Sequence, residues 1–286
     1  MEKMMSRNIL VWLSCLFVNS LYAQQIDIYE PAILEVEYYR RQVTDTLDRE
    51  NDFFGDVIRL RIGKSKSMFY NHKNIWYDSL GCYNPELQWQ IREAFYDNKK
   101  TQQDNPPFGR NLEVIYKNYK DKKLDLYYFG FNAWHYNEDM EMPQWKLQDS
   151  TKIILGYPCQ LAISRYRGRT WYAWFTFDIP ISDGPWKLYG LPGLILEACD
   201  SDKDYTFTVT SMWDKGIPDI ALYNYKDREW LTTTRLRYLK TRYRDINTNQ
   251  AAIYGNMYNL NLRGGESNAK LPHRNYDLEE RDYHDK

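Results

Sequence analysis

Residues 171–179 read WYAWFTFDI, and this stretch decides the fold. The alternation of apolar and more polar side chains has the period of a β-strand with one buried face. Five side chains share the apolar face: Trp171, Ala173, Phe175, Phe177 and Ile179. Residues 152–164 have the pattern of a second strand, and residues 165–169 between the two contain a glycine and supply a turn. The sequence therefore predicts a β-hairpin.

Two more strands follow the hairpin. Residues 194–199 are apolar on both faces apart from Glu197, which is the pattern of a central strand covered on each side. After a turn at 200–204, residues 205–210 alternate again. We therefore expect four consecutive antiparallel strands in the middle of the chain.

The flanking sequence extends this sheet and adds helices. Strand patterns occur at 32–46, 56–62, 112–119 and 124–131. One helix is predicted over 85–98, with proline in its first turn, and a second helix carries an apolar stripe made by Leu236, Leu239, Tyr243 and Ile246. The 16% aromatic content also favours a sheet, because broad rings fit a pleated surface. The predicted class is mainly β (α+β), a curved antiparallel sheet or open half-barrel with a few packed helices.

The sequence divides into three parts. Residues 1–23 have the positive start, short apolar run and small-residue exit of an export signal. Residues 24–261 form a single β-rich domain, and residues 262–286 lack apolar content and are expected to be a disordered tail. No later segment reaches the ~20 apolar residues that span a bilayer, so we expect no transmembrane helix in the mature chain. We expect an exported protein of the periplasm or cell envelope, with lipid attachment at Cys15 as the alternative to plain secretion.

Charge and cysteine content exclude several classes of protein. The chain has 38 Lys and Arg against 39 Asp and Glu, and a formal charge of −1 gives no bulk attraction for nucleic acid. Removal of the export signal leaves Cys82, Cys159 and Cys199, so at most one disulfide forms. A bridge between Cys159 and Cys199 is not expected, because the strand order places them at opposite ends of their strands. The spacing contains no paired metal-ligand motif, and we expect no metal and no cofactor.

A longer motif lies between the second and third of these strands, where residues 184–198 read GPWKLYGLPGLILEA. This segment resembles the motif for which the GLPGLI family is named, a group of exported proteins that are widespread in Bacteroidetes. The motif positions are Gly184, Pro185, Gly190, Leu191, Pro192, Gly193, Leu194 and Ile195. The flanking stretches 152–159 and 166–174 agree with the family pattern, so the resemblance covers most of residues 30–215. The family is largely uncharacterised, and the resemblance implies no catalytic residues.

The motif also has a local structural meaning. Residues 191–194 (LPGL) fit a type II turn in which Gly193 takes a positive φ, and the Gly184-Pro185 pair makes a second corner. The short arm between the two corners either carries Trp186, Lys187 and Tyr189 to the rim of a cavity or closes one end of the barrel, with Trp186 as a plug.

Further candidate ligand-binding residues lie on the predicted hairpin. Arg167 and Arg169 stand in its turn beside Arg165, where alternate side chains can project together and hold phosphate or sulfate. Tyr172 and Trp174 lie on the mixed face of the following strand, where aromatic rings can line a cavity. The alternatives are a charged hairpin tip and ordinary aromatic packing.

Catalytic and metal motifs are weak. The sequence contains no nucleophile elbow, zinc-protease motif or phosphate loop. A serine–lysine pair, Ser267 and Lys270, falls in the predicted tail. Glu138, Asp139 and Glu141 stand beside His135 and could form a cation site, but a solvated loop explains them more simply. Asp200, Asp202 and Asp204 resemble the start of a calcium loop. The Gly and the Glu that such a loop requires are missing after them, so a hairpin turn is the simpler explanation.

These observations leave functions of different classes open. The first is a periplasmic or envelope binding module for an apolar, peptide or lipid ligand beside residues 184–193. The alternative is a hydrolase that acts on exported peptides or envelope components, which predicts convergent His, Asp or Glu side chains near the same arm; His72 and His135 lying apart and exposed would argue against it. A third is a partner of an outer-membrane or export system. None of them involves nucleic acid.

Overall fold

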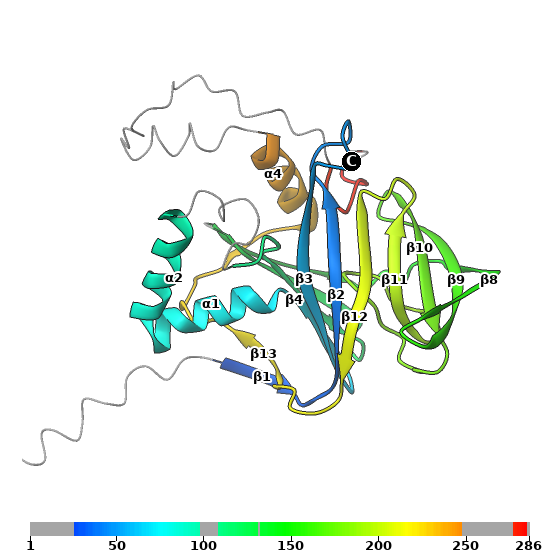
Figure 1. Ribbon diagram of the computed structural model, residues 1–286, viewed down its shortest axis with the longest axis horizontal. Helices are drawn as coiled ribbons and strands as arrows, with labels where there is room; N and C mark the ends of the chain where they lie inside the picture. The colour runs from blue at the N-terminus through cyan, green and yellow to red at the C-terminus, as the bar shows by residue number, and fades with distance from the viewer. Residues whose placement is uncertain (1–25, 98–107, 131, 248–276, 285–286) are drawn as a thin grey trace, which may run out of the picture.

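The computed structural model describes residues 26–97, 108–130, 132–247 and 277–284 (Figure 1). Twelve strands form one large sheet: β2 (Ala32–Val43), β3 (Phe53–Gly63), β4 (Lys66–Tyr70), β5 (Glu113–Asn118), β6 (Lys123–Phe129), β7 (Ala133–Asp139), β8 (Lys146–Ile154), β9 (Tyr157–Tyr166), β10 (Arg169–Thr176), β11 (Leu194–Asp200), β12 (Tyr205–Trp213) and β14 (Leu231–Thr232). Two further strands pair with each other in a small second sheet: β1 (Ile26–Glu30) and β13 (Ile220–Tyr223). The described helices are α1 (His72–Tyr83), α2 (Pro85–Asp97) and α4 (Arg235–Asn247).

The strands of the large sheet follow the order β14-β7-β6-β5-β4-β3-β2-β12-β11-β10-β9-β8. Neighbouring strands are antiparallel throughout, except that β14 runs parallel to β7. In Figure 1, β8 to β11 form a curved wall on one side of β2 and β3, and the three helices lie on the other side. The predicted class, a mainly β protein with an open antiparallel sheet and a few helices, is confirmed.

The central hairpin and the two strands after it form as the sequence predicts. β9 pairs with β10, β10 with β11, and β11 with β12, each antiparallel. β11 therefore has a strand on each side, and its first three residues, Leu194, Ile195 and Leu196, are fully buried.

The apolar face of β10 ends earlier than its sequence indicates. Trp171, Ala173 and Phe175 are fully buried, but the strand ends at Thr176 and the side chain of Phe177 is 53% exposed. The pairing of β10 with β11 contains a bulge directly before Phe175. The extra residue of this bulge is Leu196 of β11, because Trp174 lies opposite Glu197 and Phe175 opposite Ile195. The apolar face of β10 therefore ends because the strand itself ends at Thr176.

Other boundaries also differ from the prediction. The stretch 152–164, expected to be one strand, belongs to β8 and β9, because Leu155 and Gly156 take positive φ angles of 47° and 85° and turn the chain. Residues 133–139 form β7 and not a solvated loop. α1 was not predicted, since its sequence HKNIWYDSLGCY has little apolar periodicity; the Asn71 side chain caps it by accepting a hydrogen bond from the Lys73 backbone N–H at 3.0 Å.

An aromatic cluster forms the core between the sheet and the arm at residues 184–193. The Trp171 ring lies 5.3 Å from the Trp186 ring and 6.3 Å from the Phe207 ring, measured between centroids. Phe207 in turn contacts Phe69 of β4 at 6.0 Å. All four side chains are buried. Trp186 is therefore part of the core and occupies the position of the plug.

The corners of the arm differ from the predicted type II turn. Positive φ angles occur at Trp186 (53°) and Gly190 (94°), and Gly193 does not have one. Gly193 is needed for another reason, because a Cβ atom there would lie 1.9 Å from the carbonyl oxygen of Thr176. The glycine allows the start of β11 to approach the end of β10 closely.

Residues 277–284, part of the stretch expected to be a disordered tail, are packed. Leu278 and Tyr283 are buried against the core, and Glu280 is buried among charged side chains. Two buried apolar side chains and several ion pairs hold this segment in place. Its sequence has no apolar periodicity of a helix or strand, so the pattern alone did not indicate that it is ordered. The rest of that stretch, including Ser267 and Lys270, lies outside the described residues, as do the predicted export signal and Cys15.

The three cysteines that the structure describes are unpaired, and none of the described helices could span a membrane. Cys82, Cys159 and Cys199 are all free, and β10 lies between the strands that carry the last two. Across the described parts of the chain, no helix has both the length and the apolar character needed to cross a membrane.

Replacement of Gly193 by alanine tests the close approach. Gly193→Ala places a methyl group against the Thr176 carbonyl, and we expect it to lower the free energy of unfolding by about 1–3 kcal/mol or more. Gly81→Ala is the matched control, because Gly81 lies in α1 and its added Cβ would meet only the flexible end of Gln88. Alanine favours the helix, so this variant should keep or raise the stability by up to about 1 kcal/mol. Urea unfolding measures both, and equal losses would contradict the argument.

Candidate functional site

The two ends of the large sheet approach each other at one seam. β7 lies near one end of the strand order and β8 at the other, yet only residues 140–145 connect them. A link of this length spans at most roughly 25 Å, so the sheet must curl until its ends approach. The arm at 184–193, α4 and the segment 277–284 meet at this seam through charged side chains.

Lys187 lies at the centre of the seam. Its side chain is 0% exposed, and its Nζ donates to Glu138 Oε1 at 2.5 Å, to Glu280 Oε1 at 2.6 Å and to the Tyr136 hydroxyl at 3.0 Å. Three acceptors match the three donors of an ammonium group. One buried cation thus joins the arm, β7 and the segment 277–284.

Two guanidinium groups flank Lys187 and bind the same carboxylates. Arg167, in the turn between β9 and β10, donates to Glu138 Oε2 at 2.8 Å. Arg235, at the start of α4, donates to Glu280 Oε2 at 2.5 Å and also pairs with Asp282. Glu138 and Glu280 are therefore each shared between two or more cations.

Two more arginines extend the contact along the segment 277–284. Arg40 of β2 pairs with Glu279, and Arg169 donates to the Leu278 carbonyl from Nη2 at 2.8 Å and from Nε at 3.2 Å. We call the set Arg40, Arg167, Arg169, Lys187 and Arg235 the basic groove.

Main-chain contacts hold the same segment. The backbone N–H of Arg281 donates to the carbonyl of Arg167 at 2.8 Å, and the Tyr205 hydroxyl donates to the carbonyl of Asp277 at 2.6 Å. The segment, which ends in a turn over residues 282–284, is thus held by side-chain charges and by its own main chain.

The charges of the groove hold each other in their ionised forms. Burial lowers the pKa of an ammonium group, but at Lys187 the interactions with Glu280 and Tyr136 outweigh burial and raise the pKa well above its ordinary value. Burial raises the pKa of a carboxyl group, but at Glu280 the nearby Lys187 and Arg235 outweigh it and lower the pKa. The groove therefore selects an ionised carboxylate at this position.

The structure brings together three of the candidate residues predicted from the sequence. Arg167, Arg169 and Lys187 all contact either Glu280 or the Leu278 carbonyl. Trp186 and Tyr189 are buried in the arm; the Tyr189 carbonyl accepts a hydrogen bond from Trp145 Nε1 at 2.8 Å. The arm therefore fills the concave side of the sheet and lines no cavity at these two residues.

Tyr172 and Trp174 lie elsewhere. They alternate with Trp171 and Ala173 along β10, so they point to the opposite face of the sheet. There the Lys152 ammonium lies 4.5 Å from the centre of the Trp174 ring and also donates to Glu197 at 2.6 Å. The structure does not join these two aromatic residues to the basic groove.

Several residues of the groove were missed from the sequence. Arg40 and Arg235 lie within a strand and at a helix start, and Glu279, Glu280 and Asp282 lie in a polar stretch. The only sequence signal for the segment was the pair of apolar residues Leu278 and Tyr283 that flanks these carboxylates.

The other predicted groups have local partners. Ligand atoms of Asp200, Asp202 and Asp204 lie within 4.8 Å of one another, but Arg169 and Arg281 already pair with this cluster, and Asp200 accepts from the Tyr205 backbone N–H at 2.8 Å as a turn residue does. This fits the predicted hairpin turn.

The histidines proposed for a hydrolase lie on separate elements. His135 of β7 contacts Asp125 at 2.9 Å through Nε2, and its ring stacks on Tyr127 with centroids 4.3 Å apart. His72 is the first residue of α1. Glu138 and Glu141 pair with Arg167 and form no cation site with His135.

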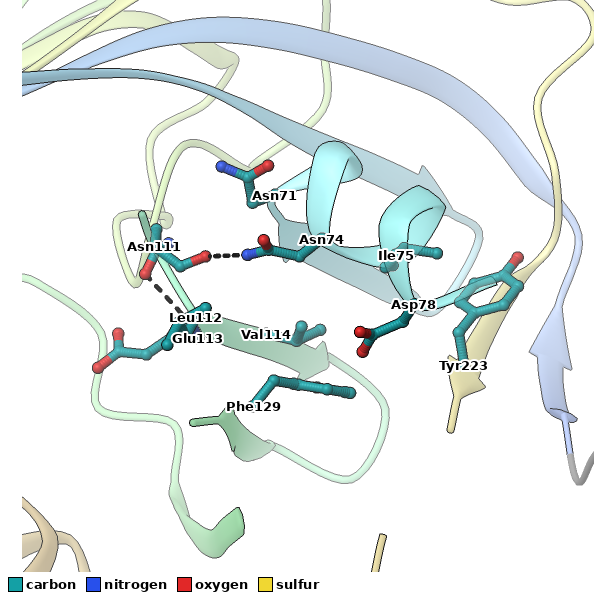
Figure 2. Close-up of a pocket in the computed structure, with 10 residues that line it drawn as sticks. All are labelled: Asn71, Asn74, Ile75, Asp78, Asn111, Leu112, Glu113, Val114, Phe129 and Tyr223. Carbon is teal, nitrogen blue, oxygen red and sulfur yellow. Dashed lines mark hydrogen bonds between the residues drawn. The ribbon is translucent and has the colours of Figure 1, made fainter. Parts of the chain in front are cut away.

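A small cavity between α1 and β5 is too small for an organic ligand. Figure 2 shows its lining, including Asn71, Asn74, Asp78 and Asn111, with the Asn74 amide donating to the Asn111 carbonyl at 2.6 Å. The cavity has a volume of about 10 Å³, which is room for one water molecule at most. The cavity between α1 and β5 is therefore no site for an organic ligand.

Neutralisation of Glu280 tests the electrostatics of the groove. Glu280→Gln leaves Lys187 and Arg235 short of a buried partner, and we expect a loss of about 3–5 kcal/mol at neutral pH. The folded pKa of Glu280 lies below the ordinary value of 4.5, so its contribution is full above that pH and is lost as the pH falls toward the folded pKa. The stability difference between the native chain and Glu280→Gln should therefore shrink below pH 4.5 in urea unfolding.

The matched control is Glu141→Gln. Glu141 also pairs with Arg167, at 3.3 Å, but its side chain is 68% exposed. An exposed pair contributes at most about 1 kcal/mol. Similar losses for the two variants, or a Glu280→Gln effect that does not change with pH, would contradict the argument.

One protein-family model matches the centre of the chain. Residues 164–197 match the family model described as "Protein of unknown function (Porph_ging)". These residues run from the end of β9 into β11 and include Arg167, Arg169, Lys187 and the whole arm. No curated protein matches the chain in sequence.

Among solved structures, PNGF-II is similar in two crystal forms, in space groups P21 and C2. Each shows 17% sequence identity and a TM-score of 0.47, and the match covers 74% of this chain and 32% of that chain. The match thus spans about a third of the length of PNGF-II, and at this TM-score it supports no statement about activity. The family model on residues 164–197 has no assigned function, but it covers three residues of the basic groove, Arg167, Arg169 and Lys187.

Proposed function

We propose that this chain is an exported GLPGLI-type protein of the periplasm or cell envelope that binds acidic peptide segments in the basic groove. The segment 277–284 occupies the groove within the same chain, and an external peptide of the same kind would compete with it. The proposal keeps the binding module that the sequence favours and moves its ligand from a cavity beside the arm to the groove at the seam.

One observation carries this proposal. Eight consecutive residues, DLEERDYH at 277–284, lie against the groove with Glu280 buried between Lys187 and Arg235. Without this segment, three buried cations at the seam would retain Glu138 and the exposed Glu141 as partners. Buried cations without enough counter-charges are strongly unfavourable, so the groove should bind additional carboxylates.

The contacts define the chemistry of the ligand. Glu279 pairs with Arg40, Glu280 with Lys187, and Asp282 with Arg235. Apolar residues lie at both ends of this acidic run, since Leu278 and Tyr283 are buried. The preferred ligand is therefore a short acidic peptide with an apolar residue on each side of its acidic run.

The roles of the predicted residues change accordingly. Arg167, Arg169 and Lys187 contact the peptide, whereas Trp186 and Tyr189 position the arm that carries Lys187. Gly190 and the other corner residues of the motif set the path of this arm. The burial of Trp186 in the aromatic core gives no support for an apolar ligand at that point.

Peptide binding tests the proposal. We expect a chain that ends at residue 276 to bind a labelled peptide of sequence DLEERDYH saturably in fluorescence anisotropy, and the peptide should raise its thermal midpoint by linkage. A peptide with Glu280→Gln should bind at least about tenfold more weakly, because Lys187 then keeps Glu138 but loses its second carboxylate partner. A scrambled peptide of the same composition is the control for net charge.

If the shortened chain does not fold, a full-length variant can replace it in this experiment. The full chain with Glu280→Gln has a weakened segment of its own, so it should bind the labelled native peptide, while the native full chain should bind it much less. If neither chain binds the peptide, or if the scrambled peptide binds equally well, the groove is only an internal contact and the proposal fails.

A further inference from the structure

A second surface, independent of the groove, lies along β8. This strand is the last in the order of the large sheet, and in the part of the chain that the structure describes no strand pairs with its outer side. An edge strand presents unpaired N–H and C=O groups that can template the addition of another strand. At nine residues, β8 is long for an exposed edge.

The side chains of β8 add apolar surface to this edge. Leu147 is 49% exposed and Ile153 is 68% exposed, and Leu155 just after the strand is 51% exposed. Lys146, Asp149 and Lys152 lie between or beside them. Exposed apolar residues rimmed by charges are typical of an interaction surface.

We propose that β8 pairs antiparallel with β8 of a second copy of this chain, with the two-fold axis at Ser150. Leu147 of each copy then lies opposite Ile153 of the other, so the two most exposed apolar positions of the strand cover each other twice. Asp149 lies opposite Thr151, whose hydroxyl can donate to the carboxylate. The large sheets of the two copies become one continuous sheet.

Charge and parity select this register over its neighbours. Along two antiparallel strands, hydrogen-bonded and non-hydrogen-bonded residue pairs alternate. A two-fold axis between two residues would make two successive pairs equivalent, which this alternation forbids. The axis must therefore pass through a residue. An axis at Asp149 places Asp149 opposite its own copy and Lys146 opposite Lys152. Like charges directly opposite each other are destabilising.

An axis one residue further along is also less favourable. With the axis at Thr151, Asp149 lies opposite Ile153 and loses the Thr151 hydroxyl as a partner. With the axis at Ser150, no like charges are opposed and the apolar side chains match. The charged residues of β8 therefore leave one register that suits a second copy.

The bulge in β8 is compatible with this arrangement. The pairing of β8 with β9 is irregular between Leu147 and Thr151 and regular on either side. The proposed axis passes through this irregular stretch, where Ser150 is small. Lys146 and Leu147, before the irregular stretch, then lie opposite Ile154 and Ile153 of the other copy, after it.

Sedimentation of the purified full chain over a range of concentrations tests the pairing. We expect a reversible dimer, and Ile153→Lys should raise its dissociation constant at least about tenfold, because it replaces both central apolar contacts by charges. Leu231→Lys is the matched control: Leu231 is 52% exposed on β14, at the other end of the sheet, and this variant should dimerise normally.

Cysteine cross-linking tests the register. In a chain with Cys82→Ser, which removes the exposed native thiol, the combination of Leu147→Cys with Ile153→Cys should give a disulfide-linked dimer under mild oxidation, since opposite residues come within reach of a disulfide. Leu147→Cys alone should give none. A chain that sediments as a monomer, a dimer that Ile153→Lys does not weaken, or efficient linkage by Ile153→Cys alone would overturn the proposal.

Discussion

The three-way contact of Lys187 with Glu138 and Glu280 is the constraint on which the seam depends. A buried ion pair gives little net stability over an apolar pair, because both charges lose their hydration. What it imposes is geometry, since an ammonium group without its carboxylates is strongly unfavourable at this depth. Lys187 belongs to the arm, Glu138 to β7 and Glu280 to the segment 277–284. One cation therefore fixes three segments that lie far apart in the sequence, and the packing of Trp186 follows from the same placement.

The part of the fold that was predictable is the part whose signal is local. Each residue of β10 reports its own burial through the alternation of Trp171, Ala173 and Phe175, so the four central strands could be expected from their sequence. The division between β8 and β9 could not, because two residues with positive φ decide it. α1 was also missed, since it begins at a capping asparagine and lacks an apolar stripe.

The candidate site was predictable only on its basic side. Arg167 and Arg169 drew attention because they cluster in a tight turn, and Lys187 because it lies between two glycine and proline corners. Glu280, which Lys187 contacts directly, is 93 positions away from Lys187 along the chain. A carboxylate in a polar stretch has the same sequence pattern whether it is solvated or buried, so only the three-dimensional structure reveals this pairing. The close approach at Gly193 was likewise not predictable from the sequence, because it depends on the position of the Thr176 carbonyl.

The position of Glu280 late in the sequence affects how the molecule matures. A ribosome releases the chain from its N-terminus, so Lys187, Arg167 and Arg235 emerge well before the residues that complete their charge balance. Until Glu280 and Asp282 have been made, the seam has only Glu138 and the exposed Glu141 as counter-charges for its three cations, so its closure is disfavoured. Under the export that we propose, this delay holds the polypeptide in a loosely folded form that a translocation channel can thread.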